Sequence, residues 1–136
     1  MTLKIKSLII LGLVVLCQAN YTEKQEQMLD DIAEQCGMDM GIKLNDDFVQ
    51  LFKFTGDLPN DDDSQEFITC ALHKIDAVDE DGYVIADKFV DFESDGHDLD
   101  AVKEVVEKCA KVEGDSVNER GYNFYKCFWD EKKYEI

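Results

Sequence analysis

The sequence predicts a single small all-α domain, a compact bundle of about six short helices. Apolar residues recur at spacings of three and four along six separate stretches, as they do on helices with one buried face. Glycines and helix-capping residues separate these stretches, and no segment alternates apolar and polar residues convincingly as a half-buried strand would. Four cysteines fall on the predicted helices, so two disulfides would staple a bundle whose core is necessarily small.

Residues 1–19 have the features of a secretory signal peptide. Lys4 and Lys6 give a basic start, residues 8–16 form an uncharged apolar run, and Cys17 and Ala19 place small residues before a cleavage site. The run is shorter than the roughly 20 residues that a membrane span needs, which disfavours the alternative of an N-terminal anchor. We therefore expect a secreted, extracellular protein with no membrane span, whose single domain comprises residues 20–136.

The chain is strongly acidic, with 31 Asp and Glu against 14 Lys and Arg and a formal charge of −17. Loss of Lys4 and Lys6 with the signal peptide takes this charge to −19. Such a charge repels nucleic acids and anionic membranes, so neither is an expected partner. A solvated, solubilising surface is the simplest interpretation, and a cationic partner would be tolerated.

The cysteines of the predicted mature chain are even in number, as expected for disulfides in a short secreted protein. They are Cys36, Cys70, Cys109 and Cys127. Their spacing fits no zinc site, and three disulfide pairings are open from the residues alone.

Each expected helix has a local start or stop signal. The expected helices run from Thr22 to about Cys36, from Asn45 through Phe52, from Ser64 to the turn at Gly82, from Val84 to Phe92, from Asp98 towards Gly114, and from Val117 to about Trp129. Thr22 with Gln25 and Ser116 with Glu119 form capping boxes. Gly37 suits the left-handed position just after the first helix.

The third helix is the centre of the predicted bundle. Ser64 is its expected N-cap, because the three aspartates before it would lie at the positive end of the helix dipole. Cys70 falls within its broad apolar band, and Gly82 supplies the positive φ that the closing turn needs.

Two acidic turns imitate calcium-binding loops, but each lacks the ligand that closes such a loop. With Gly82 at loop position six, Ala77 stands at the first position and Lys88 at the twelfth. Around Gly96, the twelfth position is Val102. Calcium loops of this type need a carboxylate first and a bidentate glutamate last. A calcium-responsive helical protein therefore stays only as an alternative, and no metal is expected.

Signatures of catalysis are absent from the sequence. His73 and His97 are the only histidines, no serine or cysteine lies in a nucleophile motif, and there is no glycine-rich phosphate loop. A small secreted hydrolase is a weaker alternative, and we expect neither enzymatic activity nor a cofactor.

Segments around the cysteines form the pattern of a known family. Residues 55–63, TGDLPNDDD, precede a helix in which Cys70 is followed by ALHKIDAVDEDG. Residues 108–129, KCAKVEGDSVNERGYNFYKCFW, contain the last two cysteines, and Cys36 fits the first cysteine position. These segments and the helix order resemble the insect odorant-binding proteins of the pheromone and general odorant-binding type. The resemblance covers essentially the whole predicted mature chain and implies a six-helix fold.

The chain departs from the six-cysteine pattern of that family at two positions. Glu66 and Asn118 stand where the family has its second and fifth cysteines, which pair with each other. The chain therefore resembles the four-cysteine, or C-minus, subclass. The pairing implied by the resemblance is Cys36–Cys70 and Cys109–Cys127. Because the missing bridge would tie the third helix to the last, we expect a looser cavity wall and broader ligand tolerance.

The resemblance implies a secreted carrier of small hydrophobic ligands, such as odorants, pheromones or similar semiochemicals. The chain is rich in aromatic residues for a small helical domain, which suits an internal apolar cavity, although core packing explains any single one. A chemosensory receptor is a further suggested partner, and we expect a monomer or a weak homodimer. The candidate wall residues are Phe52, Phe54, Leu72, Phe89, Val106, Tyr122, Phe124 and Phe128. Tyr122 could add a hydrogen bond to a polar ligand head.

Overall fold

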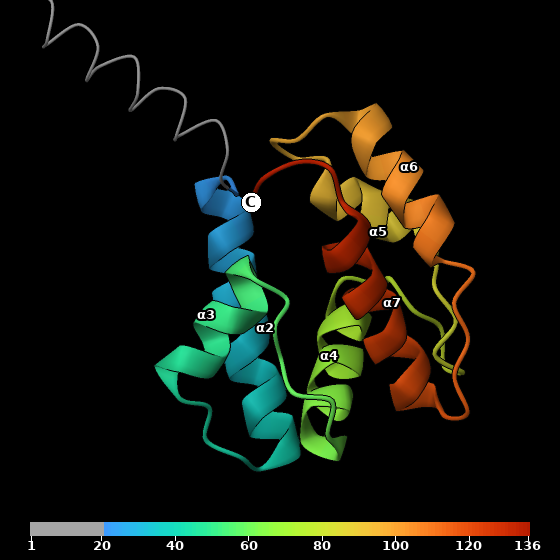
Figure 1. Ribbon diagram of the computed structural model, residues 1–136. Coiled ribbons are helices and arrows are strands. Elements are labelled where there is room, and N and C mark those ends of the chain that lie inside the picture. The colour runs from blue at the N-terminus through green and yellow to red at the C-terminus, as the bar shows by residue number, and fades with distance from the viewer. Residues whose placement is uncertain (1–20) are drawn as a thin grey trace, which may run out of the picture.

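The computed structural model describes residues 21–136, so the predicted signal peptide lies outside the described residues. The helices are α2 Glu23–Met40, α3 Asp46–Phe54, α4 Asp62–Lys74, α5 Ala86–Glu93, α6 Leu99–Cys109 and α7 Val117–Glu131 (Figure 1). Within this part of the chain the only β-type pairing is an isolated bridge between Val78 and Val84. The predicted all-α class with six helices is therefore confirmed.

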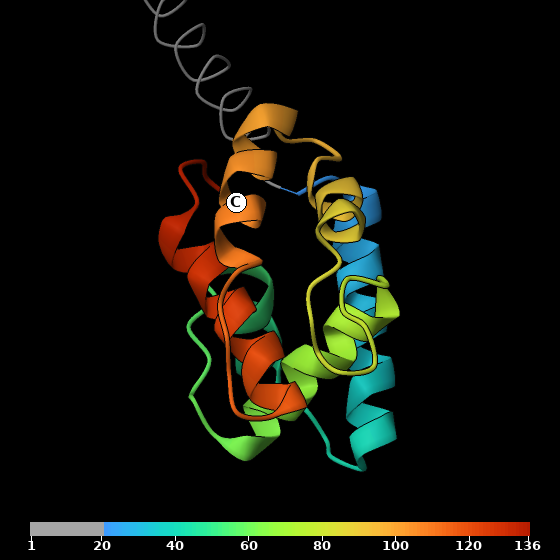
Figure 2. The same ribbon diagram turned by 90° about the vertical axis from the view of Figure 1, so that its right-hand side faces the viewer.

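The helix α7 lies between α4 and α6 and contacts both of them (Figures 1 and 2). On the outer flanks, α2 packs against α4 and carries α3, while α5 packs against α6. The largest fully buried side chains are those of Phe67, Phe124 and Phe128, so the core is built mainly from α4 and α7. Among residues 21–136, no helix is both long and apolar enough to cross a membrane.

Several predicted helix starts are confirmed by their capping hydrogen bonds. Thr22 and Gln25 form the reciprocal capping box of α2. The side chains of Asn45, Asp98 and Ser116 each accept a hydrogen bond from the backbone N–H three residues further on. Each such cap stabilises its helix by about 1 kcal/mol, which explains why these boundaries follow from local sequence.

The predicted boundaries of α4 were wrong at both ends. Asp61, not Ser64, is the N-cap, and its carboxylate accepts the Ser64 backbone N–H at 2.8 Å. Aspartate caps as well as serine, and this start places two further aspartates in the first turn, near the positive end of the dipole. The helix ends at Lys74, because Asp76 turns the chain with a φ of 58°. Gly82 belongs to the following loop.

Other boundaries also moved for reasons of packing. Gly37 lies inside α2, and the left-handed residue after that helix is Gly41, with a φ of 68°. A Cβ on Gly37 would lie 3.3 Å from the Ile42 carbonyl oxygen, so Gly37 lets the chain fold back closely after the helix. The helix α5 starts at Ala86 because Val84 is held in the bridge to Val78.

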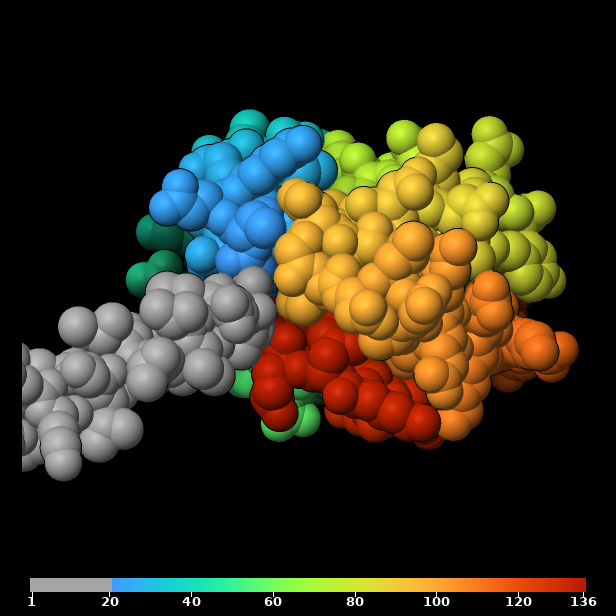
Figure 3. All heavy atoms as spheres, turned by 90° about the horizontal axis from the view of Figure 1, so that it is seen from above, coloured from blue at the N-terminus to red at the C-terminus, as the bar shows by residue number. Residues whose placement is uncertain are grey.

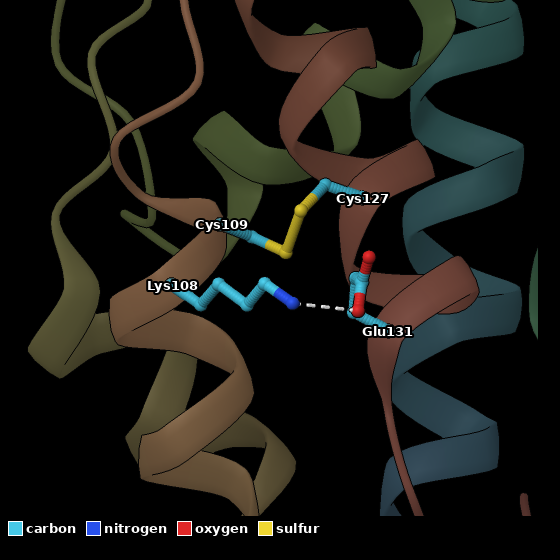
Figure 4. The surroundings of a disulfide bond; sticks show 4 residues. All are labelled: Lys108, Cys109, Cys127 and Glu131. Atoms are coloured by element: carbon cyan, nitrogen blue, oxygen red, sulfur yellow. Dashed lines mark hydrogen bonds and ion pairs between the residues drawn. A yellow bond between two sulfur atoms is a disulfide. The ribbon is translucent and has the colours of Figure 1, made fainter.

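Two disulfides connect the helices in the pairing that the resemblance implied. Cys36–Cys70 joins α2 to α4, and Cys109–Cys127 joins α6 to α7. The loops closed span 34 and 18 residues, so each bond stabilises the fold by about 3–4 kcal/mol through restriction of the unfolded chain. Beside the second disulfide, Lys108 and Glu131 form an exposed ion pair at 2.8 Å between the same helices (Figure 4).

The helices α4 and α7 meet closely without a disulfide between them. The Thr69 hydroxyl lies 3.4 Å from the Asn118 carbonyl oxygen, to which it donates. A Cβ on Gly121 would lie only 2.6 Å from the Thr69 oxygen, so glycine is needed for this approach. Glu66 is exposed. The expectation of a looser wall at this junction stays a prediction.

Candidate functional site

An apolar cavity that is partly open to solvent lies between α2, α4 and α5, with single contributions from α3 and α7. Its lining residues are Tyr21, Leu29, Ile32, Phe52, Ile68, Ala71, Leu72, Ile75, Phe89, Phe92, Glu93 and Tyr125. The space open to the centre of a water-sized sphere is about 40 Å³, where a single water needs roughly 10–15 Å³. A ligand larger than a few waters therefore requires the walls to move apart.

Three of the eight predicted wall residues line this cavity: Phe52, Leu72 and Phe89. They come from α3, α4 and α5, so the structure brings together positions that are far apart in the sequence.

The other five predicted wall residues lie outside the lining of this cavity. Val106, Phe124 and Phe128 are buried in the core, and Phe54 is half-buried at the end of α3. The Tyr122 hydroxyl donates to the Leu58 carbonyl oxygen at 2.8 Å, so it anchors the loop between α3 and α4.

Two of these core residues, Phe124 and Phe128, pack against the lining residue Phe89. The ring centroid of Phe89 lies 5.0 Å from that of Phe124 and 5.0 Å from that of Phe128, both in edge-on contacts. Such pairs add about 0.5–1.5 kcal/mol beyond area burial. A change at Phe124 or Phe128 would therefore shift the wall residue Phe89 even without touching a ligand.

The tyrosine hydroxyl of the lining residue Tyr125 forms a hydrogen bond within the protein. The Tyr125 hydroxyl donates to the Phe52 carbonyl oxygen at 2.9 Å, joining α7 to α3. Burial raises the pKa of Tyr125 far above its usual value, so this hydroxyl keeps its proton. The Tyr125 proton is therefore not available for a hydrogen bond to a ligand.

Glu93 is the only acidic residue among those that line the cavity, and only 1 % of it is exposed. The hydroxyls of Tyr21 and Tyr134 donate to its two carboxyl oxygens, each at 3.3 Å. Burial raises the pKa of Glu93 to about 8, although these hydrogen bonds and the charge of Lys132 act to lower it. At neutral pH the group is therefore mostly protonated.

The surroundings of Glu93 join the two ends of the described chain. Gln25 Nε2 donates to the Phe92 carbonyl oxygen at 2.9 Å, and His97 Nδ1 lies 3.1 Å from the Glu93 carbonyl oxygen. The His97 ring packs against Tyr21 and Tyr134, with centroids 5.7 Å and 5.0 Å away. The C-terminal segment thus packs against the end of α5 and against His97, and Figure 3 shows the red segment beside the orange atoms.

The acidic turn that imitates a calcium loop is held by its own hydrogen bonds. Asp79 Oδ1 accepts the backbone N–H groups of Asp81 at 2.9 Å and Tyr83 at 3.0 Å. In residues 21–136, no group of three or more His, Cys, Asp or Glu is placed to hold a metal ion. Asp79 thus organises the turn between Val78 and Val84.

Glu93, Tyr21 and Tyr134 were not predicted as site residues. Glu93 is one of 31 acidic residues in the chain, and its apolar neighbours on α5 give no sign of its burial. The only local signal is its place in the sequence next to Phe92, at the end of an apolar stripe. Its partners lie 72 and 41 residues away, so only the fold brings them together.

Comparison with known proteins places this geometry in a family. A solved structure, the odorant-binding protein dmelOBP28a from Drosophila melanogaster, is similar with a TM-score of 0.68 and 20 % sequence identity. The match covers 82 % of this chain and 94 % of that chain, and at this identity it shows a shared fold. No match was found among curated protein sequences. The model of the PBP/GOBP family matches residues 18–131, and the chain therefore belongs to that family, as the resemblance to insect odorant-binding proteins predicted.

Proposed function

We propose that the protein is a secreted carrier, which binds small hydrophobic ligands such as odorants, pheromones or related semiochemicals in the cavity between α2, α4 and α5. Its family consists of non-enzymatic carriers of small hydrophobic ligands. The observation that carries the proposal is the lining itself, which is aliphatic or aromatic except for Glu93. The carrier would keep its ligand dissolved in extracellular fluid, helped by its own acidic surface.

The driving force for binding is the transfer of apolar ligand surface out of water, worth about 25 cal/mol per Å². Burial of roughly 300 Å² would supply about 7–8 kcal/mol, near the free energy of a micromolar complex. Widening the cavity and ordering the ligand reduce this value. The expected affinity is thus micromolar or weaker, which suits a carrier that must release its ligand.

The helix α5 is the wall that we expect to move when a ligand enters. It carries Phe89, Phe92 and Glu93, spans eight residues, and has no side-chain cap on its first turn. Disulfides hold α2 to α4 and α6 to α7, but none holds α5. Outward movement of α5 would enlarge the cavity while the two cross-linked helix pairs keep their positions.

Binding of an apolar fluorescent dye tests this function. Displacement of the dye by volatile alcohols or esters at micromolar concentration is the expected result. Trp129 is an internal reporter, because its ring lies 6.4 Å from that of the lining residue Tyr125. Failure of every such dye to bind would remove the carrier function. Transfer of the ligand to a chemosensory receptor, and a monomeric or weakly dimeric state, are further parts of the proposal.

A further inference from the structure

Glu93 is buried in the cavity lining, at a cost to the stability of the fold. Burial of a carboxyl group in an apolar site costs free energy unless it is fully paired. No cation lies within ion-pair distance of Glu93 among residues 21–136. Within the described part of the chain, its only side-chain partners are two tyrosine hydroxyls at the long distance of 3.3 Å. The cavity lining therefore includes one acidic residue that has no cationic partner in the described chain.

We propose that Glu93 determines the specificity of the cavity, and that the preferred ligands are apolar molecules bearing a single protonated amine, whose ammonium group pairs with the Glu93 carboxylate. This inference rests on the proposed carrier function and names the ligand class of the same site.

The arrangement around Glu93 suits an ammonium group better than a neutral head. The hydroxyls of Tyr21 and Tyr134 each donate to one carboxyl oxygen, so they hold the ionised carboxylate in place. An ammonium group offers three donors and a full charge, and its hydrogen bonds to a carboxylate are about twice as strong as neutral ones. The remaining lining residues would bury the hydrocarbon part of the ligand. The ionised carboxylate would repel an acidic ligand.

Lys132, the cation near Glu93, does not pair with its carboxylate. Lys132 Nζ donates to the Tyr134 carbonyl oxygen at 2.7 Å and lies 5.0 Å from the centre of the Trp129 ring. Over longer distances, the strongly negative charge of the chain attracts cationic ligands and repels anionic ones. Local pairing and the overall field therefore favour the same class of ligand.

Pairing with an amine must displace a proton. Glu93 has a pKa of about 8, whereas an alkylammonium ion titrates near that of lysine, at roughly 10.4. Between pH 6 and 8 the amine enters with its proton, and the carboxyl proton of Glu93 passes to solvent. The observed affinity for an amine should thus rise roughly fiftyfold from pH 6 to pH 8, as the ionised fraction of Glu93 rises from about 1 % to about half.

Other polar groups also lie close to Glu93, and their contribution to the pH dependence can be distinguished from that of Glu93. They are Tyr21 just before α2, Gln25 in its first turn, His97 after α5, and Lys132 and Tyr134 in the C-terminal segment. Substitution Glu93→Gln removes the carboxyl proton and leaves these groups in place. Any pH dependence that persists in this variant would belong to them.

Isothermal titration calorimetry of residues 20–136 with n-octylamine and with 1-octanol tests the inference. Measurements at pH 6, 7 and 8, in buffers of different ionisation enthalpy, give affinity and proton release together. For the wild type we expect the roughly fiftyfold rise for octylamine, a change below about threefold for octanol, and release of nearly one proton per octylamine at pH 7. Glu93→Gln should abolish the rise and the release, and lower octylamine affinity at pH 8 at least about tenfold.

The outcomes separate the inference from the function on which it rests. Octanol binding with no preference for octylamine and no proton release would overturn the role of Glu93 and leave the carrier function standing. Proton release that persists in Glu93→Gln would also overturn that role. If neither compound binds, both proposals fail. The proton count needs only the wild-type chain, so the test does not depend on the stability of the variant.

Discussion

The Tyr134 hydroxyl donates a hydrogen bond to Glu93 Oε1 at 3.3 Å, between the C-terminal segment and the end of α5. This contact links the last residues of the chain to the one carboxyl group that lines the cavity. Tyr134 and Tyr21 together position both oxygens of Glu93, so the acid–base state of the cavity depends on segments from both ends of the described chain.

Substitution Tyr134→Phe removes one of the hydrogen bonds that lower the pKa of Glu93. We expect the pKa of Glu93 to rise further above about 8, because the ionised form loses a donor while burial stays. NMR titration of the ¹³C-labelled glutamate carboxyl groups measures this shift. Tyr83→Phe is the matched control, since Tyr83 is exposed on the acidic turn. A Glu93 pKa that is unchanged or lower in Tyr134→Phe would contradict the account.

Substitution Glu93→Gln changes how the stability of the fold depends on pH. The pKa of Glu93 is about 8 when folded and about 4.5 when unfolded, so the folded chain binds more protons between these values. The stability contributed by the protonated group is thus fully present below pH 4.5 and is lost as the pH rises to about 8. Relative to wild type, Glu93→Gln should gain stability over this window, by roughly 5 kcal/mol at most.

Urea unfolding of wild type and Glu93→Gln at several pH values measures that difference. Subtracting the two curves removes the contribution of the other acidic groups, which both chains share. Two parallel stability curves between pH 5 and 8 would show that Glu93 does not titrate in the predicted way.

Substitution Gly121→Ala places a methyl group about where the Thr69 side chain lies, 2.6 Å from its hydroxyl oxygen. We expect a loss of stability of about 1–3 kcal/mol, as for other overpacked helix contacts. Thr69→Ala in the same chain removes the obstructing oxygen and should restore part of the loss. Thermal unfolding of the single and double variants checks this coupling. Additive effects of the two changes would mean that the helices do not meet as described.

Cysteines at Glu66 and Asn118 should form a bridge between α4 and α7 that the family pattern contains and this chain lacks. We expect slower exchange of ligand in the double variant, because the bridge restrains the relative movement of these helices. Stopped-flow release of a bound dye measures the exchange rate, with Glu66→Ser/Asn118→Ser as the unbridged control. Equal release rates in a variant whose bridge is shown by mass spectrometry would contradict the expected looser wall.

Local sequence predicted the helices well, because caps such as Thr22 and Asn45 act within a few residues. Ser64 was predicted as the cap in place of Asp61. Serine and aspartate are both good caps, so local sequence does not separate the two positions. Gly37 was predicted to lie just after the helix. Its role inside the helix depends on close packing against Ile42 and Leu44, which the sequence alone does not show. The disulfide pairing came from the family resemblance, since the residues alone left three pairings open.

The cavity was harder to predict than the fold. A helical pattern separates apolar faces from polar ones, but it does not separate residues that fill the core from residues that line a cavity. Phe89 and Phe128 both lie on apolar faces, yet only Phe89 reaches the lining. Glu93 was missed because its burial depends on Tyr21 and Tyr134, which are close only in the folded chain.

Ligand binding by a cavity-filling variant shows whether the apolar cavity holds the ligand. Ala71 lines the cavity, so Ala71→Phe should occupy it, whereas Ala101→Phe adds the same atoms on α6 outside the cavity. With an apolar fluorescent dye displaced by 1-octanol, and with folding checked by circular dichroism, we expect Ala71→Phe to weaken octanol binding at least about tenfold, equivalent to about 1.4 kcal/mol. Ala101→Phe should bind octanol as the wild type does. Equal binding by all three chains would place the ligand elsewhere and contradict the account.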